Sequence, residues 1–218
     1  MKSYLSLAWK ELKAQKVTSV LILLAVILST VATTVMGQSV GILQSMRREQ
    51  AAGLNGDRYA TFHQLTREQS KVLHEDTRLK DVGTWINVGD LELENSSLTL
   101  FLREYYGDAL SAYPSMEAVK EGRLPETSGE IALSEETLKY LGLEEKIGEK
   151  IRLPLEVGLL IDDQPKYEYT ADFVLTGILE NNYLGYASGT LSGIVGEGTA
   201  ESLLPERYLS YSTDYKTV

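Results

Sequence analysis

Residues 17–36 read VTSVLILLAVILSTVATTVM, and this stretch decides the architecture of the N-terminal part of the chain. All 20 residues are apolar or carry a small hydroxyl group, and no charged residue occurs from Val17 to Met46. A helix rises about 1.5 Å per residue, so 20 residues cross a hydrocarbon core about 30 Å thick. We therefore expect a transmembrane helix over residues 17–40.

The charges on the two sides of this stretch predict its orientation. The residues before it hold Lys2, Lys10, Lys13 and Lys16 against Glu11 alone, whereas the whole chain has 21 basic and 31 acidic residues. The part after the stretch therefore keeps 17 basic and 30 acidic residues. Basic residues stay on the cytoplasmic side of a membrane, so we expect a cytoplasmic N-terminus, with residues 57–218 forming an extracytoplasmic domain.

A cleaved secretory signal is the alternative interpretation, because it shares the lysine-bearing start and the apolar segment. Signal peptides have an apolar core of about 7 to 15 residues and a small-x-small cleavage site. Here the apolar core is longer, and residues 31–37 (VATTVMG) offer no clean A-x-A site. These two features favour an uncleaved membrane anchor.

The first 16 residues have an amphipathic pattern. Apolar residues recur at helical spacing on one side and polar residues take the other, which predicts a cytoplasmic interfacial helix over residues 1–16. The alternative is that these residues merely flank the anchor. The apolar set is Tyr4, Leu5, Ala8, Trp9 and Leu12, and the polar set is Lys2, Ser3, Ser6, Lys10 and Lys13.

Small residues recur at every fourth position of the expected membrane helix: Ala25, Ser29, Thr33, Gly37 and Gly41. Such a ladder lets a second helix approach closely, so these five residues are our candidates for helix packing. Small residues are also common in membrane helices in general, which leaves a ladder without a partner as the alternative. Residues 41–56 keep a helical pattern and predict a helical stalk that continues the membrane helix.

Residues 57–218 mix the patterns of strands and helices, which predicts an α+β fold. Residues 57–90 read as a βαβ-like unit, and residues 91–103 as a hairpin. Residues 162–165 predict a turn, and residues 181–196 read as strand and loop. We expect strands over residues 59–61, 82–88, 91–94, 97–103, 130–133, 151–155, 167–179 and 191–195. We expect helices over residues 66–75, 115–122 and 134–141, the last with Ser134 as its N-cap and Gly142 as its C-cap.

The composition excludes several classes of function. The 218 residues are 43% hydrophobic and 24% charged, which is ordinary for a globular protein. A net charge of -10 argues against nucleic acid as a partner, because a phosphate backbone requires a basic surface. The absence of cysteine excludes disulfides, thiolate metal sites and cysteine nucleophiles.

The sequence also lacks the motifs of common active sites. It has no G-x-x-x-x-G-K-[ST] phosphate-binding loop and no G-x-S-x-G elbow, and His63 and His74 are its only histidines. We therefore expect no catalytic residue, no metal site and no cofactor on this chain. The 13 tyrosines offer either a peptide- or lipid-binding surface or half-buried strand residues, and the second is favoured because tyrosine is common in sheets.

Residues 121–155, EGRLPETSGEIALSEETLKYLGLEEKIGEKIRLPL, and residues 173–179, FVLTGIL, carry an ordered series of short motifs. The series resembles the extracytoplasmic core domain of the MacB/FtsX family of ABC transporter permeases. Residues 4–29 also look like the interfacial helix and first membrane helix of that family. The matching positions are Gly122, Arg123, Pro125, Glu130, Ile131, Leu133, Ser134, Leu141, Gly142, Ile147, Gly148, Ile151, Leu153, Phe173, Gly177 and Ile178.

The resemblance implies a permease subunit that couples ATP hydrolysis to motion of an extracellular domain, for export, extrusion or signalling. The implied partners are a cytoplasmic ABC ATPase subunit, membrane lipid, a second permease copy, and an extracellular peptide, lipid or protein. The family carries three further membrane helices, so we expect the chain to be a fragment truncated before the second. The alternative is a stand-alone, single-pass membrane-anchored extracellular binding or sensor module. An extracellular hydrolase is a third class, for which no residue constellation exists here.

Overall fold

The computed structural model describes residues 4, 10, 13–55, 58–93, 96–112, 114–144, 146–159 and 165–216. The chain divides into two compact units, Met1–Glu49 and Gln50–Val218, each of which is described by itself. Most of the expected interfacial helix over residues 1–16 lies outside the described residues, including Leu5, Ala8, Trp9 and Leu12. The turn expected at residues 162–165 also lies outside them except for Pro165.

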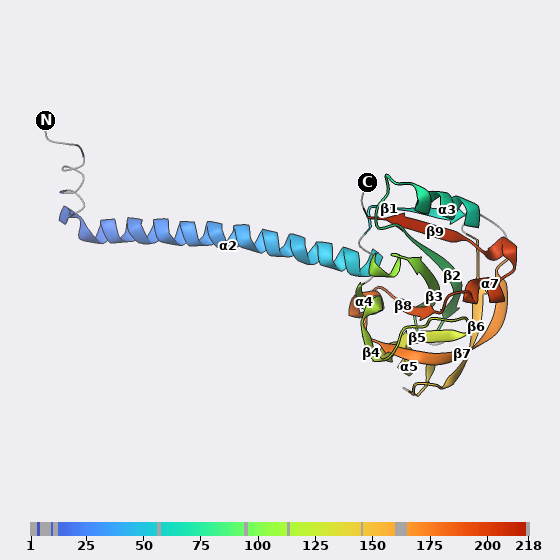
Figure 1. Ribbon diagram of the computed structural model, residues 1–218. Helices are drawn as coiled ribbons and strands as arrows, with labels where there is room; N and C mark the ends of the chain where they lie inside the picture. The colour runs from blue at the N-terminus through green and yellow to red at the C-terminus, as the bar shows by residue number, and fades with distance from the viewer. Residues whose placement is uncertain are drawn as a thin grey trace. The chain divides into compact units, whose positions relative to one another are not determined.

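The N-terminal unit is dominated by one long helix, α2 (Lys16–Asn55), which runs without interruption through the residues expected to form the membrane helix and the stalk (Figure 1). Its segment Lys16–Arg47 is long and apolar enough to cross a membrane, and no part of its most apolar window is buried. By length and composition, α2 therefore meets the requirements of a membrane-spanning helix.

Several hydroxyl groups of α2 are satisfied within the helix. Thr30, Thr33 and Thr34 each donate to the carbonyl oxygen four residues earlier, at 2.8 to 2.9 Å. Ser39 does the same at 2.8 Å. In a hydrocarbon environment an unpaired hydroxyl is costly, so these bonds make the hydroxyl residues of α2 compatible with lipid.

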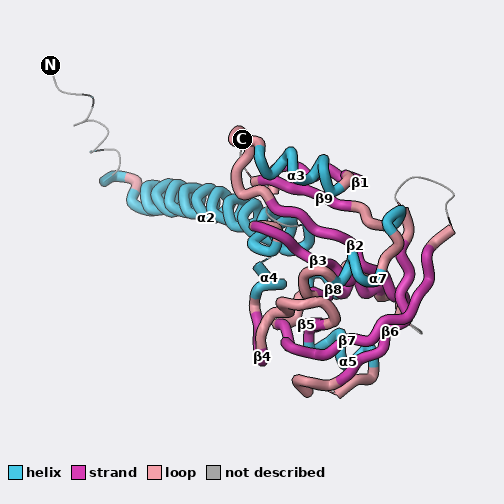
Figure 2. The backbone as a smooth tube through the Cα atoms, turned by 45° about the vertical axis from the view of Figure 1, so that its right-hand side comes forward, coloured by secondary structure: helices cyan, strands magenta, loops and turns pink. Residues whose placement is uncertain are grey.

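The second unit is an α+β domain with a mixed sheet of nine strands among the described residues (Figure 2). The strands are β1 (Ala60–Leu65), β2 (Gly83–Glu92), β3 (Thr99–Gly107), β4 (Val119–Gly122), β5 (Glu130–Ser134), β6 (Lys150–Val157), β7 (Tyr167–Leu179), β8 (Thr190–Val195) and β9 (Tyr211–Tyr215). The helices are α3 (Arg67–Glu75), α4 (Pro114–Glu117), α5 (Glu135–Leu141), α6 (Tyr183–Ala187) and α7 (Thr199–Leu203), with 3-10 turns at Leu110–Ala112 and Glu206–Tyr208.

Six of the strands close a barrel. They pair in the order β2, β3, β8, β5, β7 and β6, and β6 returns to β2 through Asp90 and Glu156. Alternate side chains point inward and build the core, as in Leu100 and Leu102 of β3, which are fully buried. The barrel therefore encloses a packed core.

Two further strands, β9 and β1, extend the sheet beyond this barrel. The first half of β2 pairs with β9 and the second half meets β6, and a bulge at residues 87–89 lies between the two. β9 then pairs with β1, which is one end of the sheet, while β4 on β7 is the other. β1, α3 and β2 follow each other as the expected βαβ-like unit, but β9 is inserted between its two strands.

Several expected elements have the expected bounds and caps. β7 covers residues 167–179, and α5 follows Ser134, whose side chain accepts a hydrogen bond from the backbone N–H of Thr137. Gly142 ends α5 with φ of 67°, a left-handed conformation that favours glycine. The hairpin of β2 and β3 is also present.

Other expectations were wrong. The two strands expected over residues 82–88 and 91–94 are one strand, β2 (Gly83–Glu92), because its bulge lets it continue across Gly89. The helix expected over residues 115–122 ends at Glu117, and residues 119–122 form β4, because pairing with β7 outweighs local helix propensity. Residues 181–196 contain α6 as well as β8, and β9 has no counterpart among the expected strands.

Candidate functional site

The five helix-packing candidates lie on α2. Ala25, Ser29, Thr33, Gly37 and Gly41 are exposed, and a Cβ at either glycine would meet no atom within 4 Å. A step of four residues turns the helix by about 40° beyond a full turn, so the ladder winds slowly around α2 as an i±4 ridge. A ridge of this slope suits a right-handed helix crossing.

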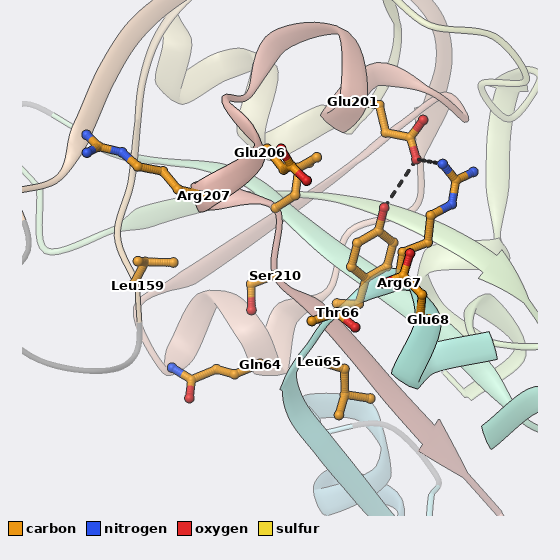
Figure 3. Close-up of a pocket in the computed structure, with 12 residues that line it drawn as sticks. Gln64, Leu65, Thr66, Arg67, Glu68, Leu159, Glu201, Glu206, Arg207 and Ser210 are labelled. Atoms are coloured by element: carbon orange, nitrogen blue, oxygen red, sulfur yellow. Dashed lines mark hydrogen bonds and ion pairs between the residues drawn. The ribbon is translucent and has the colours of Figure 1, made fainter. Parts of the chain in front are cut away.

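The described part of the domain contains a cavity, the α3–α7 groove, which has a volume of about 810 Å³ (Figure 3). It lies where β1 ends, α3 begins and β9 begins. Its lining residues are Gln64, Leu65, Thr66, Arg67, Glu68, Leu159, Glu201, Glu206, Arg207, Leu209, Ser210 and Tyr211. Its volume lies in the range typical of ligand sites.

One wall of the groove is α7, which is held in place by a buried carboxylate. Glu104 of β3 is fully buried, and its two carboxylate oxygens accept the backbone N–H groups of Gly198 and Ala200, each at 2.6 Å. The hydroxyl of Tyr106 donates to the same carboxylate. A negative charge at the positive end of a helix is favourable, so Glu104 fixes the start of α7.

α7 in turn joins α3 and β9 across the groove. The carboxylate of Glu201 pairs with the guanidinium of Arg67 at 3.0 Å and accepts a hydrogen bond from the hydroxyl of Tyr211 at 3.2 Å. Both contacts are dashed lines in Figure 3. Burial and the neighbouring Glu201 raise the pKa of Tyr211 to about 12, so its hydroxyl stays protonated and remains a donor.

The other wall, α3, is fixed to the sheet by hydroxyl groups. The hydroxyl oxygens of Ser70, Thr84 and Thr213 lie 2.8 to 2.9 Å from one another and are buried between α3, β2 and β9. Thr66 caps the start of α3 in a reciprocal capping box with Gln69. α3 is therefore attached to the sheet at its centre, through Ser70, while its first turn is stabilised by its own cap.

The groove carries a surplus of negative charge. Arg67 is engaged by Glu201, and the guanidinium of Arg207 stacks on the ring of Tyr208 at 4.6 Å and extends away from Glu206. Glu206 has no ion-pair partner among the residues that the structure describes. Glu68 also lines the groove, so its surface favours a basic group over an acidic one.

Neither histidine forms a catalytic arrangement. His74 Nε2 lies 2.9 Å from the hydroxyl of Thr84, and His63 Nδ1 lies 3.0 Å from that of Ser212. Ser212 is only 4% exposed, so no substrate reaches its hydroxyl. Within the described ranges, no group of three or more histidine, aspartate or glutamate side chains has the geometry to hold a metal ion.

Several tyrosines of the described part of the domain lie in or against the core. Tyr208, Tyr211 and Tyr215 are buried, while Tyr106 and Tyr186 are half-buried. This distribution agrees with the interpretation of tyrosine as a half-buried sheet residue.

Apart from Tyr211, which is among the tyrosines considered for a binding surface, the residues that build the groove were not singled out from the sequence. Glu104 continues the inward-facing alternation of Leu100 and Leu102, which places a carboxylate on the buried face, but only the packing of α7 against β3 shows its role. Near Glu201, Gly198 precedes a short helical pattern and thus indicates the start of a helix. A helix of five residues, however, shows too little periodicity to be predicted from the sequence.

The comparisons with known proteins give no family. No protein-family model matches the chain, and no curated protein sequence matches it. The likeness of residues 121–179 to MacB/FtsX permeases therefore stays a prediction.

Proposed function

We propose that this chain is a permease subunit of an ABC transporter of the MacB/FtsX type. In this proposal α2 is the first membrane helix, its N-terminus is cytoplasmic and the α+β domain is extracellular. A separate cytoplasmic ATPase subunit hydrolyses ATP, and the permease transmits the resulting motion to the domain. Membrane lipid and a second permease copy surround α2, and an extracellular peptide, lipid or protein meets the domain.

One observation supports this proposal above the others: the polypeptide enters and leaves the domain at the same corner. The backbone N–H of Tyr59 donates to the carbonyl of Tyr215 at 2.8 Å, and β1 pairs with β9. Arg58 and Asp214 form an ion pair at 2.8 Å in which the carboxylate side chain is only 3% exposed. A domain whose two ends meet can be inserted between consecutive membrane helices without distortion.

The same corner offers a route for mechanical coupling. A displacement of the chain at Arg58 reaches β9 through the ion pair with Asp214 and through the β1–β9 ladder. β9 pairs directly with β2, which is a strand of the barrel. A pull on the membrane-proximal chain is thereby carried into the barrel by hydrogen-bonded strands, which deform less than a loop.

The first experiment is purification of the protein from its native membrane, in mild detergent, followed by identification of co-eluting chains. The proposal expects a nucleotide-binding ATPase subunit in the same complex, with ATP hydrolysis that depends on this chain. Purification of the protein alone, with no ATPase in any membrane fraction that contains it, would overturn the proposal.

The orientation can be tested separately because the chain has no cysteine. A single cysteine in place of the exposed Glu144 should react with a membrane-impermeant maleimide in intact cells. A single cysteine in place of Lys13 should react only after the cells are opened. The reverse pattern would contradict the cytoplasmic N-terminus.

A stand-alone membrane-anchored binding module is the second candidate. The α3–α7 groove favours it, because a cavity of about 810 Å³ with charged and apolar walls needs no ATPase to bind a ligand. This candidate expects a protein that purifies without an ATPase and still binds a ligand through the groove.

A further inference from the structure

Another cavity shares the Arg67–Glu201 ion pair with the α3–α7 groove. This cavity, which we call the His74 pocket, has a volume of about 200 Å³ and is lined by residues of α3, β2, β3, α7 and β9, together with Glu197. Arg67, Glu201 and Tyr211 line both cavities. Pockets for drug-sized ligands measure about 300 to 1,000 Å³, so the His74 pocket suits a smaller molecule.

Four short contacts at the base of this pocket determine which ring nitrogen of His74 carries a proton. The hydroxyl oxygens of Ser70, Thr84 and Thr213 form a triangle with sides of 2.8 to 2.9 Å. His74 Nε2 lies 2.9 Å from the hydroxyl oxygen of Thr84. Each of the four contacts needs one proton, and three hydroxyl groups supply only three. The fourth proton is therefore on His74 Nε2.

This arrangement leaves the other ring nitrogen of His74 as an acceptor. A neutral imidazole has one N–H group and one nitrogen with a free lone pair, so Nδ1 is the acceptor when Nε2 is the donor. His74 is exposed and lines the pocket, and its Nδ1 has no hydrogen-bond partner among the residues that the structure describes. Nδ1 is therefore available to a ligand that donates a hydrogen bond.

Two tyrosine hydroxyl groups of the pocket also have their protons engaged elsewhere. Tyr106 donates to the buried carboxylate of Glu104, and Tyr211 donates to Glu201 at 3.2 Å. Burial and these neighbouring carboxylates raise the pKa of both tyrosines, so both hydroxyl groups stay protonated. Each hydroxyl oxygen can then offer a ligand only a lone pair.

Two opposite charges line the pocket without pairing with each other. Lys71 lies on α3 and Glu197 lies just before α7, and neither forms an ion pair among the described residues. The other two charged side chains of the lining, Arg67 and Glu201, neutralise each other at 3.0 Å. One wall therefore presents an ammonium group, and another presents a carboxylate beside several acceptor atoms.

We propose that the His74 pocket binds a small zwitterion, namely a free amino acid that carries both an ammonium and a carboxylate group. Lys71 pairs with the carboxylate of the ligand, and Glu197 pairs with its ammonium. His74 Nδ1 accepts an N–H of the same ammonium, and the rings of Tyr106 and Tyr211 offer apolar surface to the rest of the ligand. A ligand with only one charge would leave either Lys71 or Glu197 without a partner.

This inference goes beyond the proposed permease, because a small-molecule site on the domain needs neither an ATPase nor a second membrane helix. A missing ATPase would leave amino-acid binding unaffected. An absence of amino-acid binding would leave ATPase co-purification unaffected, so the two proposals fail separately.

The probes are the common L-amino acids, titrated one at a time by isothermal titration calorimetry against the full chain in lipid nanodiscs. Two derivatives of the amino acid that binds most tightly serve as control ligands. The N-acetyl derivative lacks the ammonium, and the amide derivative lacks the carboxylate. We expect each derivative to bind about tenfold more weakly than the parent, or weaker still, because each loses a hydrogen bond to a charged group.

Variants of the two charged residues locate the site. Lys71→Gln should weaken binding of the amino acid about tenfold and leave binding of the amide derivative unchanged. Glu197→Gln should weaken binding of the amino acid to a similar extent and leave binding of the N-acetyl derivative unchanged. The matched controls are Lys150→Gln and Glu180→Gln, which replace exposed residues outside the pocket and should change neither.

Nitrogen NMR tests the role of His74 without a substitution. In the free protein we expect a proton on Nε2 and none on Nδ1, and the Nδ1 signal should move when the amino acid is added. His63 is the only other histidine of the chain, so its signals provide an internal control and should stay in place. A proton on Nδ1 in the neutral ring would remove the acceptor from the pocket and contradict the site.

Three results of the binding experiments would overturn the proposal. The first is that no amino acid binds at millimolar concentration, and the second is that either derivative binds as tightly as its parent. The third is that Lys71→Gln and Lys150→Gln have the same effect on binding. Weaker binding in Lys71→Gln and Glu197→Gln, with thermal unfolding as in the native protein, is the result expected.

Discussion

At the scale of single residues, two glycines of the motif series bring separate stretches of backbone into contact. A Cβ at Gly177 would lie 2.3 Å from the carbonyl oxygen of Arg123, and a Cβ at Gly122 would lie 2.2 Å from that of Thr176. Side-chain carbons do not approach backbone oxygens so closely, so β4 and β7 pack together only because these residues lack a side chain. This pair of glycines has a structural role and needs no ligand.

Replacement of Gly177 by alanine tests this role. We expect Gly177→Ala to lower the free energy of unfolding by about 2 to 3 kcal/mol, because β4 must move away from β7. The matched control is Gly129→Ala, where φ is 84° but no atom lies within 4 Å of the added carbon. Its cost should be about 1 to 2 kcal/mol of backbone strain. Denaturant unfolding measures the loss of stability in both variants. A larger loss for Gly129→Ala than for Gly177→Ala would contradict this explanation.

Glu130 makes stability depend on pH. Its carboxylate accepts hydrogen bonds from Arg123 at 3.0 Å and from the backbone N–H groups of Glu126 and Thr127 at 2.8 and 3.2 Å. Arg123 and these N–H groups lower the pKa of Glu130 from 4.5 to about 2. A carboxyl with a lowered pKa in the folded state stabilises the protein above its unfolded pKa and loses this effect as the pH falls.

We therefore expect the free energy of unfolding to fall between about pH 4.5 and pH 2, in part through Glu130. Glu130→Gln should be less stable than the native protein at pH 6 and should lose less stability on acidification. Urea unfolding at pH 6, 4 and 3 measures both. Equal losses in the two proteins would show that Glu130 does not contribute, and Glu121→Gln, an exposed residue of β4, serves as the control.

At the scale of elements, α7 depends on a single side chain of another strand. Glu104→Gln keeps the size of the side chain but places an amide N–H₂ where two backbone donors need an acceptor. We expect a loss of about 1.5 to 3 kcal/mol, because the lost hydrogen bond involves a charged group. The amides of Gly198 and Ala200 should exchange with solvent faster in this variant.

The control for this prediction is Glu197→Gln, which changes an exposed carboxylate just before the same helix. It should leave both the stability and the exchange of these two amides unchanged. If the amides of Gly198 and Ala200 exchange at the native rate in Glu104→Gln, then apolar contacts and not the carboxylate hold α7 in place.

The small-residue ladder of α2 makes a prediction about association in the membrane. Replacement of Ser29, Thr33 and Gly37 by leucine should weaken binding of α2 to a partner helix, because large side chains keep the two backbones apart. The control replaces Thr30, Thr34 and Gln38 by leucine, which has the same spacing on a face about 100° away. A detergent pull-down in which both triple variants assemble equally would contradict the ladder.

Some helices and strands could be predicted from the sequence and others could not. α2 could be predicted because 20 uninterrupted apolar positions have few alternatives, and α5 because Ser134 and Gly142 supply both caps. The helix prediction for residues 119–122 was wrong because four residues are too few to show the alternation of a strand. These residues form β4 because they pair with β7. The same reason hides β9, which is buried between β1 and β2 and whose sequence, YSTDY, lacks an apolar alternation.

At the scale of the whole molecule, the candidate groove escapes sequence analysis for a related reason. It is assembled from β1, α3, α7 and β9, which are more than 130 residues apart at the extremes, and only the sheet order brings them together. Polar residues such as Glu201 and Arg67 are common on surfaces, so their pairing has no local signature. The sequence predicted the separation into an apolar helix and an α+β domain, whereas the groove follows from the topology.

This separation predicts that residues Gln50–Val218 fold without the rest of the chain. The most apolar window of α2 is not buried, and all the buried core residues lie at position 86 or later. No residue of α2 is among the buried core residues that the structure describes, so we expect the core to form without the apolar part of α2. We expect the fragment to be soluble and to unfold within about 3 °C of the full-length domain, a difference of less than about 1 kcal/mol.

A fragment that starts at Arg67 should behave differently, because it lacks β1 and leaves Asp214 buried without Arg58. Removal of one partner of a buried ion pair costs about 3 to 5 kcal/mol, so this shorter fragment should melt about 10 °C lower or more. Differential scanning calorimetry of the two fragments measures both. If the longer fragment is also insoluble or strongly destabilised, then α2 takes part in folding the domain and the two units are not independent.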